Sequence, residues 1–403
     1  MLWTRRALMP AERGAPLATN RGPGWRRLSG ATRALPGCGL QGASAGAPTG
    51  AEGGSRGLDE WNLTVELPAR GPRASPGRRP GRTLRRASLA LLIAAGLPAA
   101  AESVSQWLDR RANPPPGRMV AVGGRRQHLV CRGQGTPTVV LDAGLGGPWT
   151  QWARVQPEAA RFSRVCAYDR AGLGWSYPGP LPRDSRRMAA ELHALLQASG
   201  ERGPFLLVGH SLGALNAWVF AARFPEAAAA LALSDPPHLE AFPILPSEKV
   251  EQESASVLRA GRLQALAAHL GLVRLYATVA RPDGFLASTR ALPAEVQGPD
   301  LATRLRPARV FTAAAERAAL RISATEALST GNLGRMPVVV VASTRPDGSD
   351  PTLRLHRRLA ARAPNFRLVA VPQSGHHIPL EAPGVLVREI RRLLETLREG
   401  GPR

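Results

Sequence analysis

The chain has 403 residues, of which 44% are hydrophobic, enough for one large domain with a sizeable core and a tail. Its formal net charge is +23, but only one of the 53 basic residues is a lysine, Lys249. The near-absence of lysine is better explained by a GC-rich coding sequence, which favours arginine codons, than by selection for a basic surface. The arginines are dispersed and accompany no nucleic-acid-reading motif. We therefore predict that the protein has no nucleic-acid partner.

Residues 1–87 have the composition of an unfolded segment. They hold 15 arginines and five acidic residues, are rich in Gly, Pro and Ala, and show almost no apolar periodicity. Such a segment cannot bury enough surface to fold, so we predict a disordered extension. A transit peptide would share the Arg-rich, acid-poor composition. We favour the plain unstructured extension.

Residues 88–109 contain an apolar, Ala-rich run that follows the basic stretch 82–86. Basic residues, an apolar run and a small-residue end are typical of a signal peptide or a membrane anchor. The run of about fifteen residues is shorter than the roughly 20 that span a bilayer. We predict membrane association through this segment and favour an anchor over a cleaved export signal. A disordered segment of a cytoplasmic protein is the alternative. Residues 110–117, with three consecutive prolines, predict a stiff linker.

From residue 118 to about 400 the pattern becomes that of an α/β domain. Apolar and β-branched runs alternate with amphipathic segments and with turns marked by Gly, Pro or Asn. Strands are predicted at 119–122, 127–131, 138–141, 164–168, 205–208, 230–234, 338–342 and 366–371, and helices at 184–199, 214–224 and 386–397. Alternation of this kind predicts a mostly parallel, eight-stranded sheet with helices on both faces.

About a hundred residues, 238–335, interrupt this alternation with helical periodicity and no strand pattern. We predict a helical cap over the carboxyl ends of the strands, where open α/β sheets bind ligands. A stripe of leucines in the cap could line an apolar pocket, but core packing is the commoner explanation. Its members are Leu263, Leu266, Leu270, Leu272 and Leu275.

The pentapeptide Gly209-His210-Ser211-Leu212-Gly213 lies between a predicted strand and a predicted helix. A serine on a tight strand-to-helix turn is exposed as a nucleophile, and the turn needs small residues at Gly209 and Gly213. The helix that follows directs backbone N–H groups at the reacting centre. Ser211 is therefore the predicted nucleophile.

A serine hydroxyl needs an adjacent base, and His376 follows the last predicted strand. We favour His376 over His377 because the glycine before it allows a sharp loop, and we expect His210 to be structural. Two residues compete as the acid that orients the imidazole. Asp347 follows the strand 338–342, and Asp235 follows the strand 230–234; we favour Asp347 narrowly and leave both open.

An oxyanion hole requires two backbone N–H donors. Leu212, the residue after the nucleophile, is the first predicted donor. The Gly-rich loop after the strand 138–141 supplies the second, which we assign to Leu145. This loop lacks the Lys-Ser/Thr of a phosphate-binding P-loop, so we predict no nucleotide site.

Cys38, Cys131 and Cys166 form no C-x-x-C pair, and the adjacent histidines have no carboxylate cluster beside them. We therefore predict neither a metal nor a cofactor. Cys131 and Cys166 fall on predicted strands and could pair if the domain is exported; we favour two buried free thiols.

Several motifs taken together resemble the α/β-hydrolase (AB hydrolase-1) family of serine hydrolases, from about residue 115 to 397. They are Leu141-Asp142-Ala143-Gly144-Leu145-Gly146-Gly147, the segment 168–176 that begins Tyr168-Asp169-Arg170, the pentapeptide around Ser211, and Ser374-Gly375-His376. In this resemblance Asp169-Arg170 shapes the loop beside the site. Similar proteins often begin with one membrane-spanning helix before a Pro-rich linker, which favours the anchor.

The resemblance implies hydrolysis of a carboxylic ester, thioester or amide of a small acyl substrate through an acyl-enzyme on Ser211. An aspartate-nucleophile hydrolase is disfavoured because a serine is at the centre of the turn. Two alternatives stay open: a non-catalytic ligand-binding protein of the same fold, and an acyltransferase that uses the same covalent step.

Overall fold

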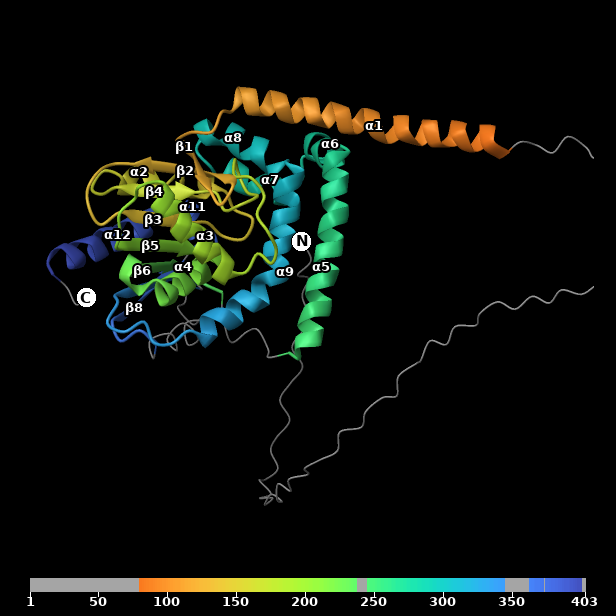
Figure 1. Ribbon diagram of the computed structural model, residues 1–403. Coiled ribbons are helices and arrows are strands. Elements are labelled where there is room, and N and C mark those ends of the chain that lie inside the picture. The colour runs from red at the N-terminus through yellow and green to blue at the C-terminus, as the bar shows by residue number, and fades with distance from the viewer. Residues whose placement is uncertain (1–79, 238–244, 345–361, 373, 401–403) are drawn as a thin grey trace, which may run out of the picture. The chain divides into compact units, whose positions relative to one another are not determined.

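The computed structural model describes residues 80–237, 245–344, 362–372 and 374–400. Within these residues the chain forms an eight-stranded sheet in the order β1-β2-β4-β3-β5-β6-β7-β8, with helices packed on it (Figure 1). The strands are β1 (Arg118–Val122), β2 (Arg125–Arg132), β3 (Val139–Asp142), β4 (Val165–Tyr168), β5 (Phe205–His210), β6 (Ala228–Ser234), β7 (Val338–Thr344) and β8 (Phe366–Pro372).

Six neighbouring strands, β3 to β8, are parallel, whereas β1 and β2 form an antiparallel hairpin whose second strand pairs with β4. The central strands are runs of Val, Leu and Ala that are buried along their length, as expected for strands covered on both faces. The predicted mostly parallel eight-stranded sheet is confirmed.

Helices cover both faces of the sheet and form two apolar cores. One core joins the sheet to α3 (Ser185–Ala198) and α4 (Leu212–Arg223). The other joins the opposite face to α12 (Pro383–Arg398), α2 (Gln156–Ala159) and the short helix α11 (Ile378–Glu381). The remaining short turns are 3-10 helices at Trp149–Trp152 and Pro225–Ala227.

The cap lies between β6 and β7, in the interval predicted for it. It contains α5 (Ser247–His269), α6 (Leu272–Val279), α7 (Asp283–Arg290), α8 (Ala294–Arg304) and α9 (Pro307–Ser329). The two long helices, α5 and α9, pack lengthwise against each other (Figure 1). Their close approach depends on Gly261, where a Cβ atom would lie 2.4 Å from the side chain of Ala314.

The interpretation of the leucine stripe is wrong for four of its five members, which are exposed, whereas Leu270 is half-buried. Leu263, Leu266, Leu272 and Leu275 are 68%, 55%, 52% and 57% exposed. The periodicity correctly placed these residues on one side of their helices, but periodicity does not reveal what covers that side. Nothing in the described part of the chain does so.

The first described element is the helix α1 (Pro80–Ala112). Residues 80–87, expected to be disordered, and 110–112, expected in the linker, therefore belong to it. The physical reason is that Pro80 is tolerated at a helix start and that residues 81–87 include Leu, Ala and three arginines, which favour helix. Residues 84–112 are long and apolar enough to cross a membrane, by length and composition alone. The predicted disorder of residues 1–79 lies outside the described residues.

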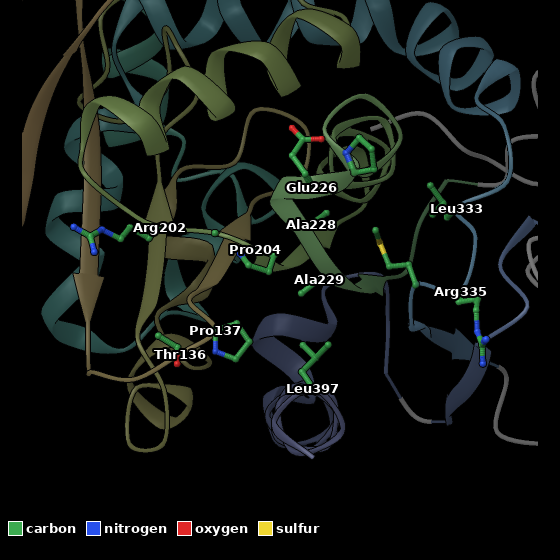
Figure 2. Close-up of a pocket in the computed structure, with 13 residues that line it drawn as sticks. Thr136, Pro137, Arg202, Pro204, Glu226, Ala228, Ala229, Leu333, Arg335 and Leu397 are labelled. Carbon is green, nitrogen blue, oxygen red and sulfur yellow. The ribbon is translucent and has the colours of Figure 1, made fainter. Parts of the chain in front are cut away.

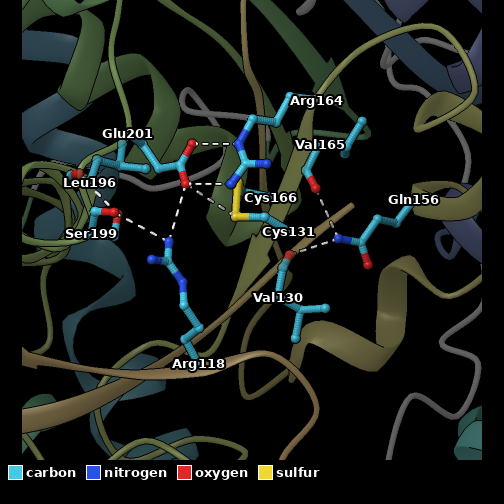
Figure 3. Close-up of a disulfide and its surroundings, with 10 residues drawn as sticks. All are labelled: Arg118, Val130, Cys131, Gln156, Arg164, Val165, Cys166, Leu196, Ser199 and Glu201. Carbon is cyan, nitrogen blue, oxygen red and sulfur yellow. Dashed lines mark hydrogen bonds and ion pairs between the residues drawn. A yellow bond between two sulfur atoms is a disulfide. The ribbon is translucent and has the colours of Figure 1, made fainter. Parts of the chain in front are cut away.

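Cys131 and Cys166 form a disulfide, which corrects the expectation of two free thiols (Figure 3). The two residues are directly opposite each other in the antiparallel pair of β2 and β4, with Cα atoms 4.0 Å apart. The sequence predicted both strands but not that they are neighbours, and this pairing brings the sulfurs together.

Candidate active site

Ser211 lies at the end of β5, where the chain turns into α4. Its backbone has φ 52° and ψ −117°, a conformation that costs about 1–3 kcal/mol for a residue with a side chain. The fold fixes this turn because the Ser211 N–H donates to the carbonyl oxygen of Ser234 on β6 at 2.9 Å. A residue held in a strained position at the carboxyl edge of a sheet is well placed for chemistry.

Gly209 and Gly213 make the turn possible. A Cβ atom on Gly209 would lie 2.2 Å from the carbonyl oxygen of Gly213, and one on Gly213 would lie 2.2 Å from that of Asp142. No side chain fits at either position without moving the backbone. The small residues expected at these two places are therefore required by the packing.

His376 and Asp235 lie together at the same edge. His376 Nδ1 is 2.6 Å from Asp235 Oδ2, and the other carboxylate oxygen of Asp235 accepts hydrogen bonds from the Ser343 N–H and hydroxyl at 3.0 and 3.1 Å. Burial alone would raise the pKa of Asp235, but the hydrogen bonds from His376 and Ser343 hold it below its usual value. The carboxylate is thus ionised and fixed against the imidazole.

Among the described residues, Asp235 is the acidic partner of His376. Asp347 lies outside the described residues, so its predicted role remains an expectation. Between Ser211 and His376 no hydrogen bond exists within the described residues. Catalytic hydrogen bonds are often long in an enzyme without substrate and tighten when substrate binds.

His210 links the serine turn to the histidine loop. Its Nε2 lies 2.8 Å from the carbonyl oxygen of His376, and the two imidazole rings are 4.8 Å apart between centroids. Burial, with a smaller contribution from His376, lowers the pKa of His210 to about 3, so the ring is neutral and its Nε2–H donates. The expected structural role therefore has a definite contact.

His377, the competing base, has no acidic partner within hydrogen-bond distance in the described part of the chain. Burial and the neighbouring His376 lower its pKa. The loop carrying both histidines is held from α11, where Glu381 accepts hydrogen bonds from the Gly375 N–H and the Ser374 hydroxyl. The sequence analysis did not single out Glu381. Its separation of only six residues from Gly375 is the signal that could have indicated a contact within this loop.

The predicted donor Leu212 directly follows Ser211, and the loop of the second donor, Leu145, passes close to Ser211 at Gly144, where a Cβ atom would lie 3.5 Å from Ser211 Cβ. Leu212 is the first residue of α4, where a helix has no preceding turn to accept its N–H. In the loop after β3, the amides of Gly144, Gly146 and Gly147 donate to Gln151, Glu316 and the Gly144 carbonyl. Of the amides at 144–147, only that of Leu145 then has no acceptor among the described residues.

A buried arginine fixes this loop. Arg170 is 2% exposed and donates to Asp142 Oδ1 at 2.6 Å, to the Gly144 carbonyl at 2.7 Å and to Glu316 at 2.8 and 2.9 Å. Glu316 is on cap helix α9 and also accepts the Gly146 N–H at 2.7 Å. The loop that carries Leu145 is therefore held from the sheet and from the cap at once.

Asp169 has the structural role that the sequence suggested for the segment Asp169-Arg170. Its carboxylate accepts the N–H groups of Trp149 and Trp175 at 2.8 and 3.1 Å and contacts His128 Nδ1 at 2.7 Å. It is fully buried, and none of these contacts is with Ser211. Glu316 was not found from sequence because α9 is far from the loop along the chain.

A small cavity of about 80 Å³ lies between the Leu145 loop and the cap. Gly146, Arg304, Arg309 and His377 are among its lining residues. Arg309 donates to the Gly146 carbonyl at 3.2–3.3 Å, and burial lowers its pKa to about 10. The cap therefore covers one side of the cavity that lies next to Leu145, the predicted oxyanion donor.

A larger cavity of about 770 Å³ lies at the other edge of the sheet (Figure 2). Its lining residues Pro137, Pro204 and Ala228 lie at or just before the starts of β3, β5 and β6, whereas Ser211 and Asp235 follow strand ends. The size of this cavity does not make it the reactive site, since the paired side chains lie at the opposite edge.

The one cluster of metal-ligand types among the described residues contains Cys131, Cys166 and Glu201, with ligand atoms within 4.8 Å of one another. Both sulfurs are used in the disulfide and cannot act as thiolates (Figure 3). Glu201 is taken by Arg164, which donates to both of its carboxylate oxygens at 2.8 Å. This cluster therefore consists of a disulfide beside an Arg164–Glu201 ion pair and is not a metal site.

The sequence profile of the alpha/beta hydrolase fold family matches residues 137–383, more than half of the chain. "Putative carbamate hydrolase RutD" of Klebsiella pneumoniae subsp. pneumoniae is 44% identical over 101 residues, which are 25% of this chain and 37% of that protein. An AB hydrolase superfamily protein of Gibberella zeae is 36% identical over 91 residues, 22% of this chain and 28% of its own length. The chain thus matches only about a third of each of these relatives.

Among solved structures, Cfl2 from Burkholderia cenocepacia is 28% identical, with a TM-score of 0.51 and coverage of 69% of this chain and 95% of that one. A thermophilic esterase from Thermogutta terrifontis is 23% identical, with a TM-score of 0.50 and coverage of 69% and 96%. The second likeness concerns the fold alone.

Proposed function

Because the chain belongs to the alpha/beta hydrolase fold family, we propose that it is a serine hydrolase that cleaves a carboxylic ester, thioester or amide through an acyl-enzyme on Ser211. The observation that carries this proposal is the 2.6 Å contact between His376 and Asp235 at the sheet edge where Ser211 occupies its strained turn. A neutral imidazole held by a carboxylate is what a serine needs beside it to become nucleophilic.

In the proposed reaction His376 Nε2 takes the proton from the Ser211 hydroxyl as its oxygen attacks the substrate carbonyl. The Asp235 carboxylate fixes the ring with Nδ1 protonated and stabilises the imidazolium that forms. His376 then gives the proton to the leaving alcohol, thiol or amine. Water then attacks the acyl carbon while His376 takes one of its protons, the bond from the acyl carbon to Ser211 Oγ breaks, and His376 returns the proton to Ser211 as the acid leaves.

The N–H groups of Leu212 and Leu145 bind the oxyanion of the tetrahedral intermediate. Each preorganised donor of this kind is worth about 3–4 kcal/mol of barrier. Both are positioned before substrate arrives, Leu212 by the helix α4 and Leu145 by the contacts of Arg170 and Glu316 with its loop. No step in this scheme needs a metal or an organic cofactor.

The substrate class is proposed from the relatives only in outline. One curated relative carries the name "Putative carbamate hydrolase RutD". A carbamate carbonyl bears oxygen and nitrogen, so this name agrees with the ester, thioester or amide proposed here. The small cavity under the cap favours a compact group next to the reacting carbonyl.

Labelling with a fluorophosphonate probe tests the proposal. The wild-type protein should form a covalent adduct at Ser211, and Ser211→Ala should form none. Ser256→Ala, an exposed position on α5, serves as the matched control and should label like the wild type. A folded wild-type protein that stays unlabelled would favour the ligand-binding alternative. Labelled protein that yields more product with an alcohol acceptor than with water would favour acyl transfer.

We also propose that α1 anchors the protein in a membrane with the hydrolase domain on the non-cytoplasmic side. Five arginines lie at 78–86, before the apolar run, and two at 102–117, after it. Such an excess keeps the preceding segment in the cytoplasm. The Cys131–Cys166 disulfide supports the same orientation, because disulfides persist in oxidising compartments and are rare in the cytosol.

A further inference from the structure

The helix α6 exposes an apolar face. Leu272, Leu275, Tyr276 and Val279 follow one another at helical spacing and are 52%, 57%, 56% and 74% exposed. Ala277, on the other side of the helix, is 5% exposed. The face that carries the large apolar side chains is thus turned away from the domain, opposite to the arrangement of an ordinary surface helix.

The end of α5 extends this face. Leu263 and Leu266 are 68% and 55% exposed, and α5 is joined to α6 by a short turn at Leu270 and Gly271. Together with the four residues of α6 they form a surface that we call the cap apolar stripe. Soluble monomers rarely expose large apolar groups so close together without a partner.

The helix α1 is fastened to the cap at this place. Glu102, only 3% exposed, accepts two hydrogen bonds from the Arg274 guanidinium at 2.8 and 3.0 Å, and Asp109 accepts a third at 2.8 Å. Arg274 is itself on α6. Gly271, at the start of α6, leaves only 3.6 Å between a hypothetical Cβ and Glu102. Arg274 therefore connects α1 to the helix that carries most of the stripe, and α6 lies beside α1 (Figure 1).

The position of this contact along α1 sets the depth of the stripe. The apolar run 87–101 of the helix spans roughly 22 Å at 1.5 Å per residue, somewhat less than the hydrocarbon thickness of a bilayer. Glu102 follows this run directly, and Asp109 lies seven residues further along α1. Trp107 is 52% exposed and has the Arg111 guanidinium 4.5 Å from its ring centroid, a pair suited to the headgroup region.

We propose that the cap apolar stripe is embedded in the interfacial layer of the bilayer beside α1, with lipid as its occupant. The proposal rests on the membrane anchor proposed above and adds a second contact, made by the cap. The exposed Arg262 and Arg281 flank the stripe and favour anionic headgroups, whereas the nearby acids Glu102 and Asp109 both form ion pairs with Arg274. The cap, and the cavity beneath it, would then face substrates dissolved in the membrane.

Site-directed fluorescence on the full-length chain tests the proposal. In a Cys38→Ser background, a polarity-sensitive thiol probe is attached at Leu275→Cys in the stripe. Gln197→Cys, an exposed helical position on α3, is the aqueous control, and Leu97→Cys on α1 reports the anchor. Each protein is reconstituted in phosphatidylcholine–phosphatidylglycerol vesicles, and quenching by lipid-borne nitroxide is compared with quenching by iodide.

The expected result is lipid quenching at 275 several-fold above that at 197, together with protection from iodide. Equal quenching at 275 and 197, with strong lipid quenching at 97, would overturn the stripe contact and leave the anchor intact. Absence of lipid quenching at both 97 and 275 would overturn both. Protection of 275 from iodide without lipid quenching would overturn the proposal in favour of a second copy of the chain. The assay is independent of catalysis, so failure of the proposed hydrolase activity would be seen separately.

Discussion

At the scale of single residues, Asp235 is held in place by His376 and Ser343. Neither of these two residues has another acidic partner in the described part of the chain. The two carboxylate oxygens of Asp235 divide between His376 and Ser343. We expect Asp235→Asn to lower kcat by roughly 10³–10⁴-fold, because an amide stabilises neither the required tautomer nor the imidazolium. Steady-state hydrolysis of a p-nitrophenyl ester measures this loss.

Asp347→Asn is the matched comparison for that measurement. Its turnover should stay within a few-fold of the wild type if Asp235 is the acid. A large loss in Asp347→Asn and a small one in Asp235→Asn would return the role to Asp347 and reduce the Asp235–His376 contact to a structural one.

His210 makes a prediction about pH and stability. Its pKa falls from 6.5 in the unfolded chain to about 3 in the folded protein, so between these values the unfolded chain binds the additional proton. Stability is then complete above pH 6.5 and declines on acidification, by about 1.4 kcal/mol per pH unit. Urea unfolding at pH 6.5 and pH 5 should show a loss of about 2 kcal/mol from this group.

His210→Gln should remove that contribution while keeping a donor toward the His376 carbonyl. The difference between variant and wild type isolates His210, since all other titrating groups are shared. His193→Gln on α3 controls for the loss of a histidine elsewhere. An unfolding free energy of His210→Gln that still falls with pH as steeply as that of the wild type would contradict the assignment.

The sequence alone predicts Ser211 as nucleophile and His376 as base but leaves the acid open between two aspartates, and the reason is spatial. Asp235 and Asp347 both follow predicted strands, so residue type and spacing do not separate them. The contact of Asp235 with His376 depends on the strand order: β6, which Asp235 follows, lies directly beside β5, the strand that leads to Ser211, and its end reaches His376. Neighbourhood in a sheet is set by long-range packing and is absent from local patterns.

At the scale of elements, the cap helix α9 takes part in shaping the site. Glu316 supplies a carboxylate to both Arg170 and the Gly146 N–H and is fully buried. We expect Glu316→Gln to lower the free energy of unfolding by about 3–5 kcal/mol, because it leaves buried Arg170 with one of its two carboxylate partners. It should also lower kcat by ~10–100-fold, since the loop of Leu145 loses a fixed contact.

Glu253→Gln on α5 is the control, since Glu253 is 56% exposed and forms a surface ion pair with Arg321. Such pairs contribute at most about 1 kcal/mol. Chemical denaturation and ester hydrolysis should be measured on both variants. A Glu316→Gln protein as stable and active as Glu253→Gln would show that the cap does not fix the loop.

The helices and strands themselves were largely predictable from the sequence. The leucines of the cap are an exception with a clear cause. The alternation of β-branched and amphipathic runs placed every strand of the sheet, and Asp184 caps α3 through the Arg187 N–H at 2.8 Å, as its position suggested. The leucines around 263–275 were misread because a stripe shows which residues share a face but not whether protein, solvent or another phase covers it.

At the scale of the whole molecule, the disulfide and the helix α1 both favour the same cellular compartment for the hydrolase domain. The proposed membrane orientation places the hydrolase domain outside the cytoplasm, and a domain in that position can keep Cys131 and Cys166 oxidised. The bond closes a loop of 35 residues, which stabilises the fold by roughly 3–4 kcal/mol in the chain-entropy description.

Thiol counting on the full-length Cys38→Ser chain, expressed in a bacterium, checks this statement. After rapid denaturation, a maleimide polymer should add to no cysteine before reduction and to two after it. A second chain with Leu89→Arg and Leu97→Arg breaks the apolar run, so its domain should stay in the cytoplasm and present two reactive thiols without reduction. If the chain with the intact run also shows two reactive thiols at once, the domain faces a reducing compartment, and both the orientation of α1 and the cross-link between β2 and β4 must be given up.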